Sequence, residues 1–314
     1  MQLFVRIVSY NVRYFGHALR GLASTRAPKE RIADKLLSLD PLPDVVCLQE
    51  VETVSLRSNV AYRRTNNQHT QLQSFMAVLE ERFAQAGREM PYEAYYFRAH
   101  TYQLRSVPIY TTGLAVLVNS QAVEVEGHNV HAPEHITHHH VQRLKDTKQS
   151  RVCAHMRLSD LRGHRFHVFN THMSLPTPFA KEFWAGKDKM GWGINQLHEA
   201  RTLAQFVRRH ANNEPFIVCG DFNSAPSSPT FRFLTEEQSL VCAQSALGQI
   251  DPEEPRGFPT AGFLHLRMHL DHLFSGGGVR WVDLQGTRPF GDVASPFHGL
   301  SDHVPLIGRF ELDG

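Results

Sequence analysis

The stretch Phe216–Pro229, FIVCGDFNSAPSSP, decides the fold, because an apolar run changes there abruptly into acid, amide and turn chemistry. Four apolar residues in a row are typical of a strand that is buried on both faces. Asp221 and Asn223 follow two residues apart, so in an extended chain their side chains point to the same side. We therefore expect a core strand that ends on two groups able to contact one ligand. A plain turn before Pro226 is the alternative.

Similar apolar, β-branched runs recur along the chain. They predict about eleven strands, at residues 3–12, 44–51, 92–98, 113–119, 122–130, 150–158, 165–173, 216–223, 269–276, 279–286 and 305–312. Apolar residues at helical spacing predict amphipathic helices over Ile32–Leu39, Leu72–Phe83 and Leu197–Val207. Some strands are apolar throughout, whereas residues 122–130 alternate like an edge strand. Two packed sheets with helices outside accommodate both kinds.

The composition is that of a soluble globular protein of 314 residues, with 41% hydrophobic and 20% charged residues and a net charge of +2. We expect one domain over residues 1–314, and a monomer. The N-terminus lacks a signal-like apolar segment, no apolar run reaches membrane-spanning length, and three of the four cysteines lie in apolar runs. These features favour a reducing, cytoplasmic location.

The predicted strands repeatedly finish on, or just before, a metal-binding or acid-base residue. These polar residues are Asn11, Glu50, Asn170, His172, Asp221, Asn223 and Asp271, and an Asp302–His303 pair opens the last strand. Taken singly, each has an ordinary alternative, such as a turn at Asn11 or a surface glutamate at Glu50. Together they indicate a site. Carboxylates and amides without thiolates suit Mg²⁺, with Mn²⁺ as the alternative, and histidines beside them can shuttle protons.

The order of these motifs resembles the endonuclease/exonuclease/phosphatase superfamily, the metal-dependent phosphoesterases of the deoxyribonuclease I fold. The resemblance spans nearly the whole chain and rests on six motifs, SYNVR, LQEV, NTHMS, GDFNS, LDHLF and SDHVPL. It implies an α/β fold, a four-layer α/β sandwich in which two packed mixed β-sheets are flanked by helices. The site is expected where strand ends and loops converge.

The resemblance also implies roles for the residues in these motifs. The position of Glu50 binds the catalytic Mg²⁺, aided by the positions of Asn11 and Asp302. Asp221 activates water or protonates the leaving group, and Asn223 positions the phosphate. Asp271 orients His303. His303 and His172 stabilise the charge of the transition state. The catalytic set is thus expected to be His172, Asp221, Asn223, Asp271 and His303.

Differences from individual branches of the superfamily reduce the number of substrate classes that the sequence fits. The abasic-site branch usually has Lys two residues after the metal glutamate, where this chain has Glu52. Inositol polyphosphate 5-phosphatases usually read GDLNYR, where this chain reads GDFNSA. The run GDFNSAPSS looks most like the deadenylase and nocturnin branch. Secreted sphingomyelinases share the NTH motif but are exported.

Long loops are the second source of substrate contacts. Aromatic residues between lysines in residues 176–193 can stack bases or a lipid, although simple packing of the loop explains them equally well. We expect contacts to substrate from Trp184 and Trp192, from Asn170, and from Arg64 in a basic patch that also fits a solvated face. The histidine run at His135–His140 lacks further ligands and reads as a loop.

Three functions remain open from the sequence. The first is a Mg²⁺-dependent nuclease acting on nucleic acid or nucleotides. The second is a phosphatase or a sphingomyelinase-like phospholipase acting on a small phosphorylated molecule or lipid. The third is a catalytically silent binding module, against which stands the retention of every motif residue, including Glu50, Asp221 and His303.

Overall fold

Two β-sheets form the centre of the structure. The computed structural model describes residues 4–15, 26–55, 71–104, 107–137, 150–176, 190–251, 253–263 and 265–312. In these residues the first sheet has the order β14 (Val279–Asp283), β15 (Leu306–Leu312), β1 (Val5–Asn11), β2 (Val45–Ser55), β4 (Val107–Asn119), β3 (Tyr92–Leu104). The second sheet has the order β10 (Val241–Cys242), β13 (Asp271–Gly276), β9 (Phe216–Asp221), β8 (Arg165–His172), β7 (Val152–Asp160), β5 (Val123–His128), and β6 (Glu134–His135) also pairs with β7.

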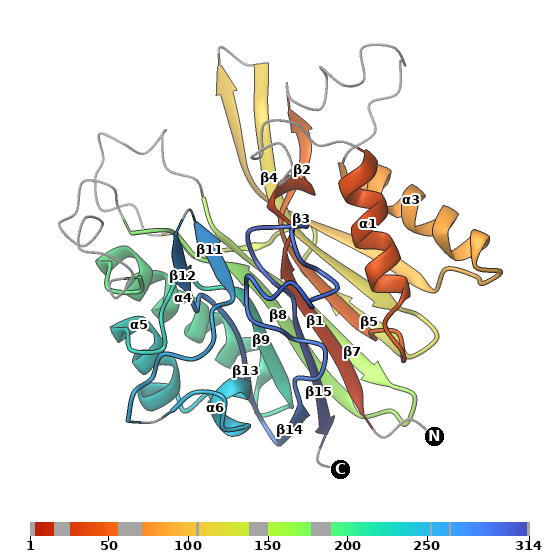
Figure 1. The fold of residues 1–314 in the computed structure, drawn as a ribbon. Helices are drawn as coiled ribbons and strands as arrows, with labels where there is room; N and C mark the ends of the chain where they lie inside the picture. Colours follow the sequence, from red (N-terminus) through yellow and green to blue (C-terminus); the bar gives the residue numbers. More distant parts are fainter. Residues whose placement is uncertain are drawn as a thin grey trace.

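Both sheets are mixed, because β1 runs parallel to β2 and β8 runs parallel to β9, whereas their other pairings are antiparallel. Helices α1 (Arg26–Leu37) and α3 (Gln71–Gln85) cover the outer face of the first sheet (Figure 1). The outer face of the second sheet is covered by α4 (Ile194–Ala211), α5 (Pro229–Arg232) and the π-helix η6 (Phe233–Glu237). The expected four-layer α/β sandwich is confirmed.

The remaining short elements lie between these layers or beside the strand ends. They are the 3₁₀ turn η1 (Arg13–Phe15), the helix α6 (Ala243–Ala246), and a separate hairpin of β11 (Ala261–Phe263) and β12 (Leu266–Met268). The described helices include none that is long and apolar enough to cross a membrane.

The layers explain why some strands are apolar without interruption. On β9, Ile217 and Cys219 belong to the core between the sheets, whereas Val218 packs under α4. On β2, Val45 and Val46 divide in the same way between the inner core and the α1–α3 layer. By contrast, β5 ends the order of its sheet and is only partly buried, as an edge strand should be.

The sequence located the main elements but not the short ones. All eleven expected strands are present, as are the three expected helices, although α1 ends at Leu37 and not at Leu39. The run His135–His140, expected to be a loop, contributes His135 to β6, and residues 138–149 lie outside the described residues. Strands β6, β10, β11 and β12 are two or three residues long, too short to show a period. The described cysteines are free and buried.

Alternation along the strands brings the polar strand ends to one place. Side chains two or four residues apart on a strand share a face. Four of the polar residues stand an even number of positions from an apolar residue of the inner core, in the pairs Ile7 and Asn11, Val168 and His172, Ile217 and Asp221, and Leu273 and Asp271. These polar residues therefore extend the core between the sheets, at the edge where β1, β8 and β9 end.

A pair of histidines lies buried under α4. The Nε2 atom of His155 is 2.8 Å from Nδ1 of His167, whose Nε2 is 2.6 Å from the Glu214 carboxylate. His155 also stacks on Phe169 at 4.6 Å between ring centroids. Burial, with His167, His210 and Arg157 nearby, lowers the pKa of His155 to about 3. His155 is thus neutral in the folded protein at neutral and mildly acidic pH.

We predict that the His155→Gln variant loses less stability in acid than the unmodified chain. Below pH 6.5 the unfolded chain protonates His155 and the folded chain does not, so folding loses stability as the pH falls toward about 3. One such proton changes the free energy of unfolding by about 1.4 kcal/mol per pH unit. Urea unfolding between pH 6 and pH 4 should show a slope shallower by that amount. The exposed His131→Gln is the control, and an equal change in both variants would refute the assignment.

Candidate functional site

Strand register places three of the expected residues side by side. On β9, Asp221 pairs with His172 of the parallel strand β8 and with Asp271 of the antiparallel strand β13. All three are buried. His303, which precedes β15, reaches the same point through an isolated bridge to Ala261 of β11. The site therefore forms between the two sheets.

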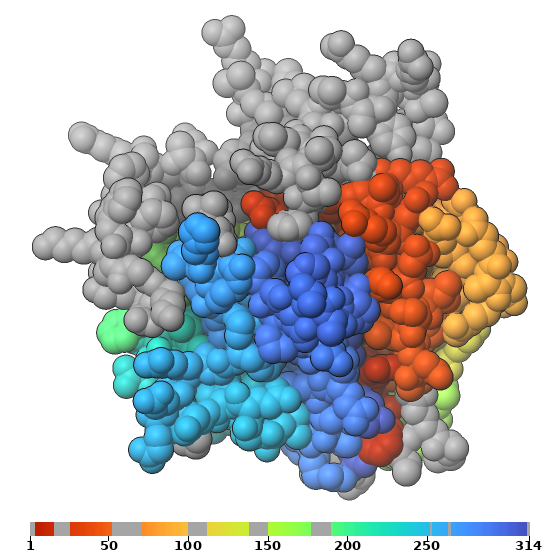
Figure 2. Space-filling view, in the orientation of Figure 1, coloured from red at the N-terminus to blue at the C-terminus, as the bar shows by residue number. Residues whose placement is uncertain are grey.

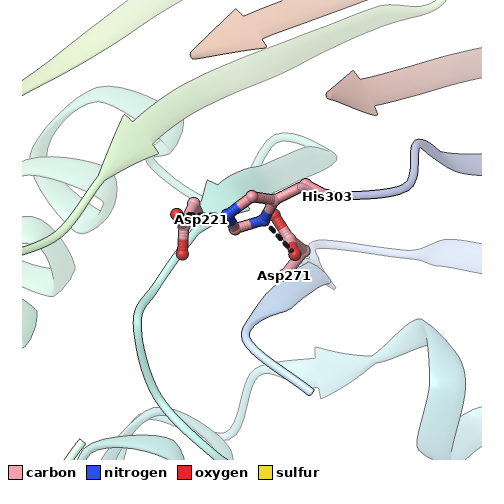
Figure 3. A group of neighbouring side chains, drawn as sticks. All are labelled: Asp221, Asp271 and His303. Atoms are coloured by element: carbon pink, nitrogen blue, oxygen red, sulfur yellow. Dashed lines mark hydrogen bonds and ion pairs between the residues drawn. The ribbon is translucent and has the colours of Figure 1, made fainter. Parts of the chain in front are cut away.

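His303 lies between two carboxylates (Figure 3). Its Nδ1 donates to Oδ2 of Asp271 at 2.9 Å, and its Nε2 faces Oδ2 of Asp221 at 3.6 Å. Burial lowers the pKa of His303, but Asp271, Asp221 and Asp302 outweigh burial and raise the pKa to about 10. His303 is therefore an imidazolium at neutral pH. It can donate to a negatively charged group placed beside Asp221.

The pKa of Asp221 is also raised. Burial raises its pKa, His303 lowers it, and the carboxylates of Asp271 and Glu50 raise it further, to about 7. The Asn223 backbone N–H donates to its Oδ1 at 2.9 Å and Asn11 Nδ2 donates to its Oδ2 at 3.1 Å. A carboxyl group with a pKa near neutral can accept and release a proton at the pH at which most enzymes work.

His172 is held as a neutral donor. Its Nδ1 lies 3.1 Å from the guanidinium of Arg151, and because a guanidinium has only donors, Nδ1 must be the acceptor. The hydrogen of the ring is then on Nε2, which lies 3.4 Å from Oδ2 of Asp221. Burial, followed by Arg151 and His303, lowers the pKa of His172 well below its usual value. His172 and His303 thus point donors at the same oxygen.

The expected metal ligands meet beside this point. Asn11 Nδ2 donates to Oε1 of Glu50 at 3.2 Å, while Oδ2 of Asp302 pairs with Arg13 at 2.5 Å. Glu50 has a positive φ of 55°, which departs from strand geometry at the irregularity between Leu48 and Val51 where the pairing of β2 with β4 shifts register. Burial, and then the charge of Asp302, raises the pKa of Glu50. Carboxylates that repel one another in this way form a fitting place for a hard divalent cation.

Asp221, Asp271 and His303 also offer ligand atoms within 4.8 Å of one another. In this group, however, Nδ1 of His303 already donates to Oδ2 of Asp271, which also accepts a hydrogen bond of 2.6 Å from the Thr260 hydroxyl. The group is therefore better described as a hydrogen-bonded chain than as a cation site. Glu50 and Asp302, which repel one another and lie next to Asn11, are the better candidates for metal ligands.

The turn after β9 is fixed from α4. Asn223, with a positive φ of 47°, donates from Nδ2 to the Met173 carbonyl at 2.9 Å, and its own carbonyl accepts from Gln196 at 2.7 Å. The hydroxyls of Ser224 and Ser228 lie 2.6 Å apart under Gly191. A Cβ on Gly191 would come within 2.4 Å of both, so only glycine fits there. Trp192, the next residue, is 44% exposed beside this turn.

Asn170, which was expected to contact substrate, lies between the two sheets. Its side chain is fully buried, its Oδ1 accepts from Gln49 at 2.8 Å, and its Nδ2 donates to the carbonyls of Leu48 and Ala115. Because Asn170 is on β8 and the other three are on β2 and β4, it joins the two sheets. The expected contacts from Trp184 and Arg64 lie outside the described residues.

Sequence reasoning missed two residues that orient the site. The Thr260 hydroxyl donates to Asp271 and accepts the backbone N–H groups of Leu270 and Asp271 at 2.9 and 3.0 Å. Arg151 fixes the tautomer of His172. Neither stands at the polar end of an apolar strand, so the pattern that revealed the other residues could not reveal these.

The comparisons with known proteins identify the family. The model of the Endonuclease/Exonuclease/phosphatase family matches residues 8–303, which contain five of the six motifs and the Asp302–His303 pair of the sixth. The chain belongs to this family. It is therefore a hydrolase that acts on phosphoester bonds. No curated protein matches the chain.

Solved structures of this family share the fold at low identity. The catalytic domain of human Nocturnin is 19% identical with a TM-score of 0.60, covering 99% of this chain and 94% of that one. ANGEL2, a 2',3'-cyclic phosphatase, is 17% identical with a TM-score of 0.60, covering 99% and 95%. A family member from Bacteroides vulgatus is 17% identical with a TM-score of 0.63, covering 99% and 100%. The neighbours support the fold, and the family follows from the sequence model.

We predict that Thr260→Val slows turnover without weakening substrate binding, because Asp271 loses the hydroxyl that orients it toward His303. Loss of such a supporting hydrogen bond costs roughly 10- to 100-fold in activity. Thr260→Ser should restore most of kcat. Thr202→Val, which removes a hydroxyl bonded only within α4, is the matched control. Steady-state kinetics on a generic phosphodiester measures kcat and KM separately. An unchanged kcat of Thr260→Val would contradict the proposal that Thr260 orients Asp271.

Proposed function

We propose that the chain is a Mg²⁺-dependent phosphodiesterase, with Mn²⁺ as a possible substitute, that cleaves nucleic acid or nucleotides. One observation carries the proposal. Donors from Asn11, His172 and His303 surround Oδ2 of Asp221, at 3.1, 3.4 and 3.6 Å, next to the carboxylate of Glu50. A phosphate beside Asp221 would meet donors on several sides. Phosphoryl transfer needs mainly such positioning and charge stabilisation.

The proposed metal ligands are Glu50, Asn11 and Asp302. A divalent cation held there would polarise a phosphate oxygen and lower the pKa of a bound water. Glu50 and Asp302 supply carboxylate oxygens, and the amide of Asn11 links Glu50 to Asp221. Arg13, paired with Asp302, balances part of the negative charge.

The proposed catalytic residues transfer protons and bind the phosphate oxygens. Asp221, with its pKa near 7, takes a proton from the attacking water or gives one to the leaving group. His303 and His172 donate to the phosphate oxygens, the first as a cation and the second as a neutral ring. Asp271 keeps His303 charged and oriented, and Asn223 helps to position the phosphate.

We propose further that the chain acts as one domain, because both sheets contribute to the site. Glu50 and Asn11 come from the first sheet, and His172 and Asp221 come from the second. A monomer in the cytoplasm remains our prediction for its state in the cell.

A second candidate function is favoured by one of the similar structures. ANGEL2 is described as a 2',3'-cyclic phosphatase, and it has also been solved with adenosine-2',3'-vanadate. A cyclic phosphodiester is a small diester, so the same donors and acid-base group suit it. A panel of single-stranded RNA, single-stranded DNA, nucleoside 2',3'-cyclic phosphates, inositol phosphates and sphingomyelin separates these classes.

We predict that Glu50→Gln removes metal-dependent hydrolysis of bis-p-nitrophenyl phosphate, because the carboxylate that holds the cation is lost. The expected decrease in kcat is roughly 100-fold or more, as for other groups that stabilise transition-state charge. EDTA should inactivate the unmodified chain, and Mg²⁺ or Mn²⁺ should restore it. The exposed Glu93→Gln is the control.

Metal binding can be tested without any substrate. Saturating Mg²⁺ should raise the melting temperature of the unmodified chain, since a ligand present at 100 times its Kd stabilises the folded state by about 2.7 kcal/mol. The Glu50→Gln variant should show a much smaller increase. Equal shifts in both proteins would place the cation elsewhere.

We predict that Trp192→Ala lowers the ratio of oligonucleotide cleavage to generic diester cleavage, because the exposed ring can stack on a base. Loss of one stacked base costs about 1 to 3 kcal/mol, or roughly tenfold in kcat/KM. Leu161→Ala is the control, because Leu161 is also exposed but lies in the β7–β8 connection, opposite the site. An unchanged ratio would show that Trp192 only packs against its neighbours.

A further inference from the structure

A pocket of about 200 Å³ opens beside the turn that follows Asn223. One wall is the turn itself, residues 225–227, a second is formed from residues 255–259, and a third is residues 267–269, which include the end of β12. Figure 2 shows the light-blue part of the chain around these last two walls at the molecular surface. We refer to this cavity as the arginine pocket, after Arg256 and Arg267.

The charge of the arginine pocket favours an anion. Arg256 and Arg267 line it, and none of the described residues that line it is acidic. Glu254 approaches Arg256 only at 3.9 Å, with both side chains more than 70% exposed, so this pair contributes little. The guanidinium of Arg267 lies 5.0 Å from the centre of the Phe290 ring. Planar guanidinium groups bind phosphate well through two donors at once.

The remaining lining favours a flat, apolar ring. Pro226, Pro259 and Met268 supply apolar surface, and the volume is below the range of pockets that hold drug-sized ligands. Gly257 has a positive φ of 60°, and a Cβ on it would lie 2.2 Å from Nδ1 of His269. The second wall therefore packs directly on the buried ring of the third. A compact, closely packed cavity of this size suits one ring system rather than an extended acyl chain.

The walls of the pocket are continuous with the catalytic residues. Ala225 follows Asn223 by two residues, His269 precedes Asp271 by two residues, and Pro259 precedes Thr260, whose hydroxyl holds Asp271. Two residues of extended chain span about 7 Å at most. The pocket walls therefore begin within about 7 Å of the backbone of Asn223 and Asp271, two residues proposed to act on the scissile phosphate.

We infer that the arginine pocket binds the nucleotide next to the scissile phosphate, with the base against Pro226, Pro259 and Met268 and its phosphate at Arg256 and Arg267. This inference rests on the proposed phosphodiesterase function and narrows its substrate. The pocket selects a single-stranded oligonucleotide over an isolated phosphate ester, because only the oligonucleotide carries a second phosphate and a second base at the required spacing.

The test compares two substrates in the Arg256→Gln/Arg267→Gln double variant. The ratio of kcat/KM for a short single-stranded oligonucleotide to that for bis-p-nitrophenyl phosphate should fall at least tenfold. Each lost phosphate contact should also reduce the slope of log(kcat/KM) against log[salt] by about 0.7. Arg165→Gln, which removes an arginine at the start of β8 opposite the site, is the control and should change neither quantity.

Two outcomes would overturn the inference and leave the proposed function standing. These are an unchanged ratio with an unchanged salt slope, or an equal loss on both substrates. Failure of the proposed function is recognised separately, because the unmodified chain would then not hydrolyse bis-p-nitrophenyl phosphate with Mg²⁺. Binding of a fluorescent oligonucleotide to the Glu50→Gln variant, with and without the two arginines, gives a readout without turnover. The arginine pair should tighten that binding, and equal affinities would count against the pocket.

Discussion

The contact between the two sheets at Asn170 is the constraint on which the rest of the structure depends. Its amide accepts from Gln49 and donates to two backbone carbonyls of the opposite sheet, and the side chain is fully buried. Buried amide groups are satisfied by specific partners, so these bonds define one register of sheet against sheet. A slip of β8 by one residue within its own sheet would turn its inward side chains outward and would remove Asn170 from these partners. The catalytic groups, shared between the sheets, would then separate.

This constraint explains how far the sequence could predict the site. Asn11, His172, Asp221 and Asp271 continue the inward-facing positions of apolar strands, and alternation with a period of two is visible in a sequence. Asn170 shares that pattern, but its amide is occupied by hydrogen bonds to Gln49, Leu48 and Ala115, which the sequence does not reveal. Thr260 and Arg151 each contact a partner on another element, Asp271 and His172, and the fold alone brings these partners together. Nothing local in their sequence marks them.

The ion pair between Arg13 and Asp302 depends on a backbone conformation that residues other than glycine rarely adopt. Arg13, Tyr14 and Phe15 all have positive φ values, between 42° and 57°, which costs of order 1–3 kcal/mol for each residue. Phe15 is buried and stacks on Phe75 at 4.8 Å between ring centroids, so packing under α3 offsets that cost. The turn brings Arg13 to Asp302. A hydrophobic contact on the outer face of a sheet thus places a cation beside the proposed metal ligands.

The backbone segments that position the proposed catalytic residues also form the walls of the arginine pocket. The SAPSSP turn begins at Ser224, which is held by Ser228 and whose carbonyl accepts from Nε2 of His272 at 2.7 Å, and it continues into the wall of the arginine pocket. On the other side, Thr260 lies between that pocket and Asp271. A substitution that reshapes the pocket would therefore shift Asn223 or Asp271 unless these anchors remained. Substrate preference in such a site is changed at lowest cost through Arg256, whose side chain is 82% exposed, because Arg267 stacks on Phe290, which is bonded to Pro259 beside Thr260.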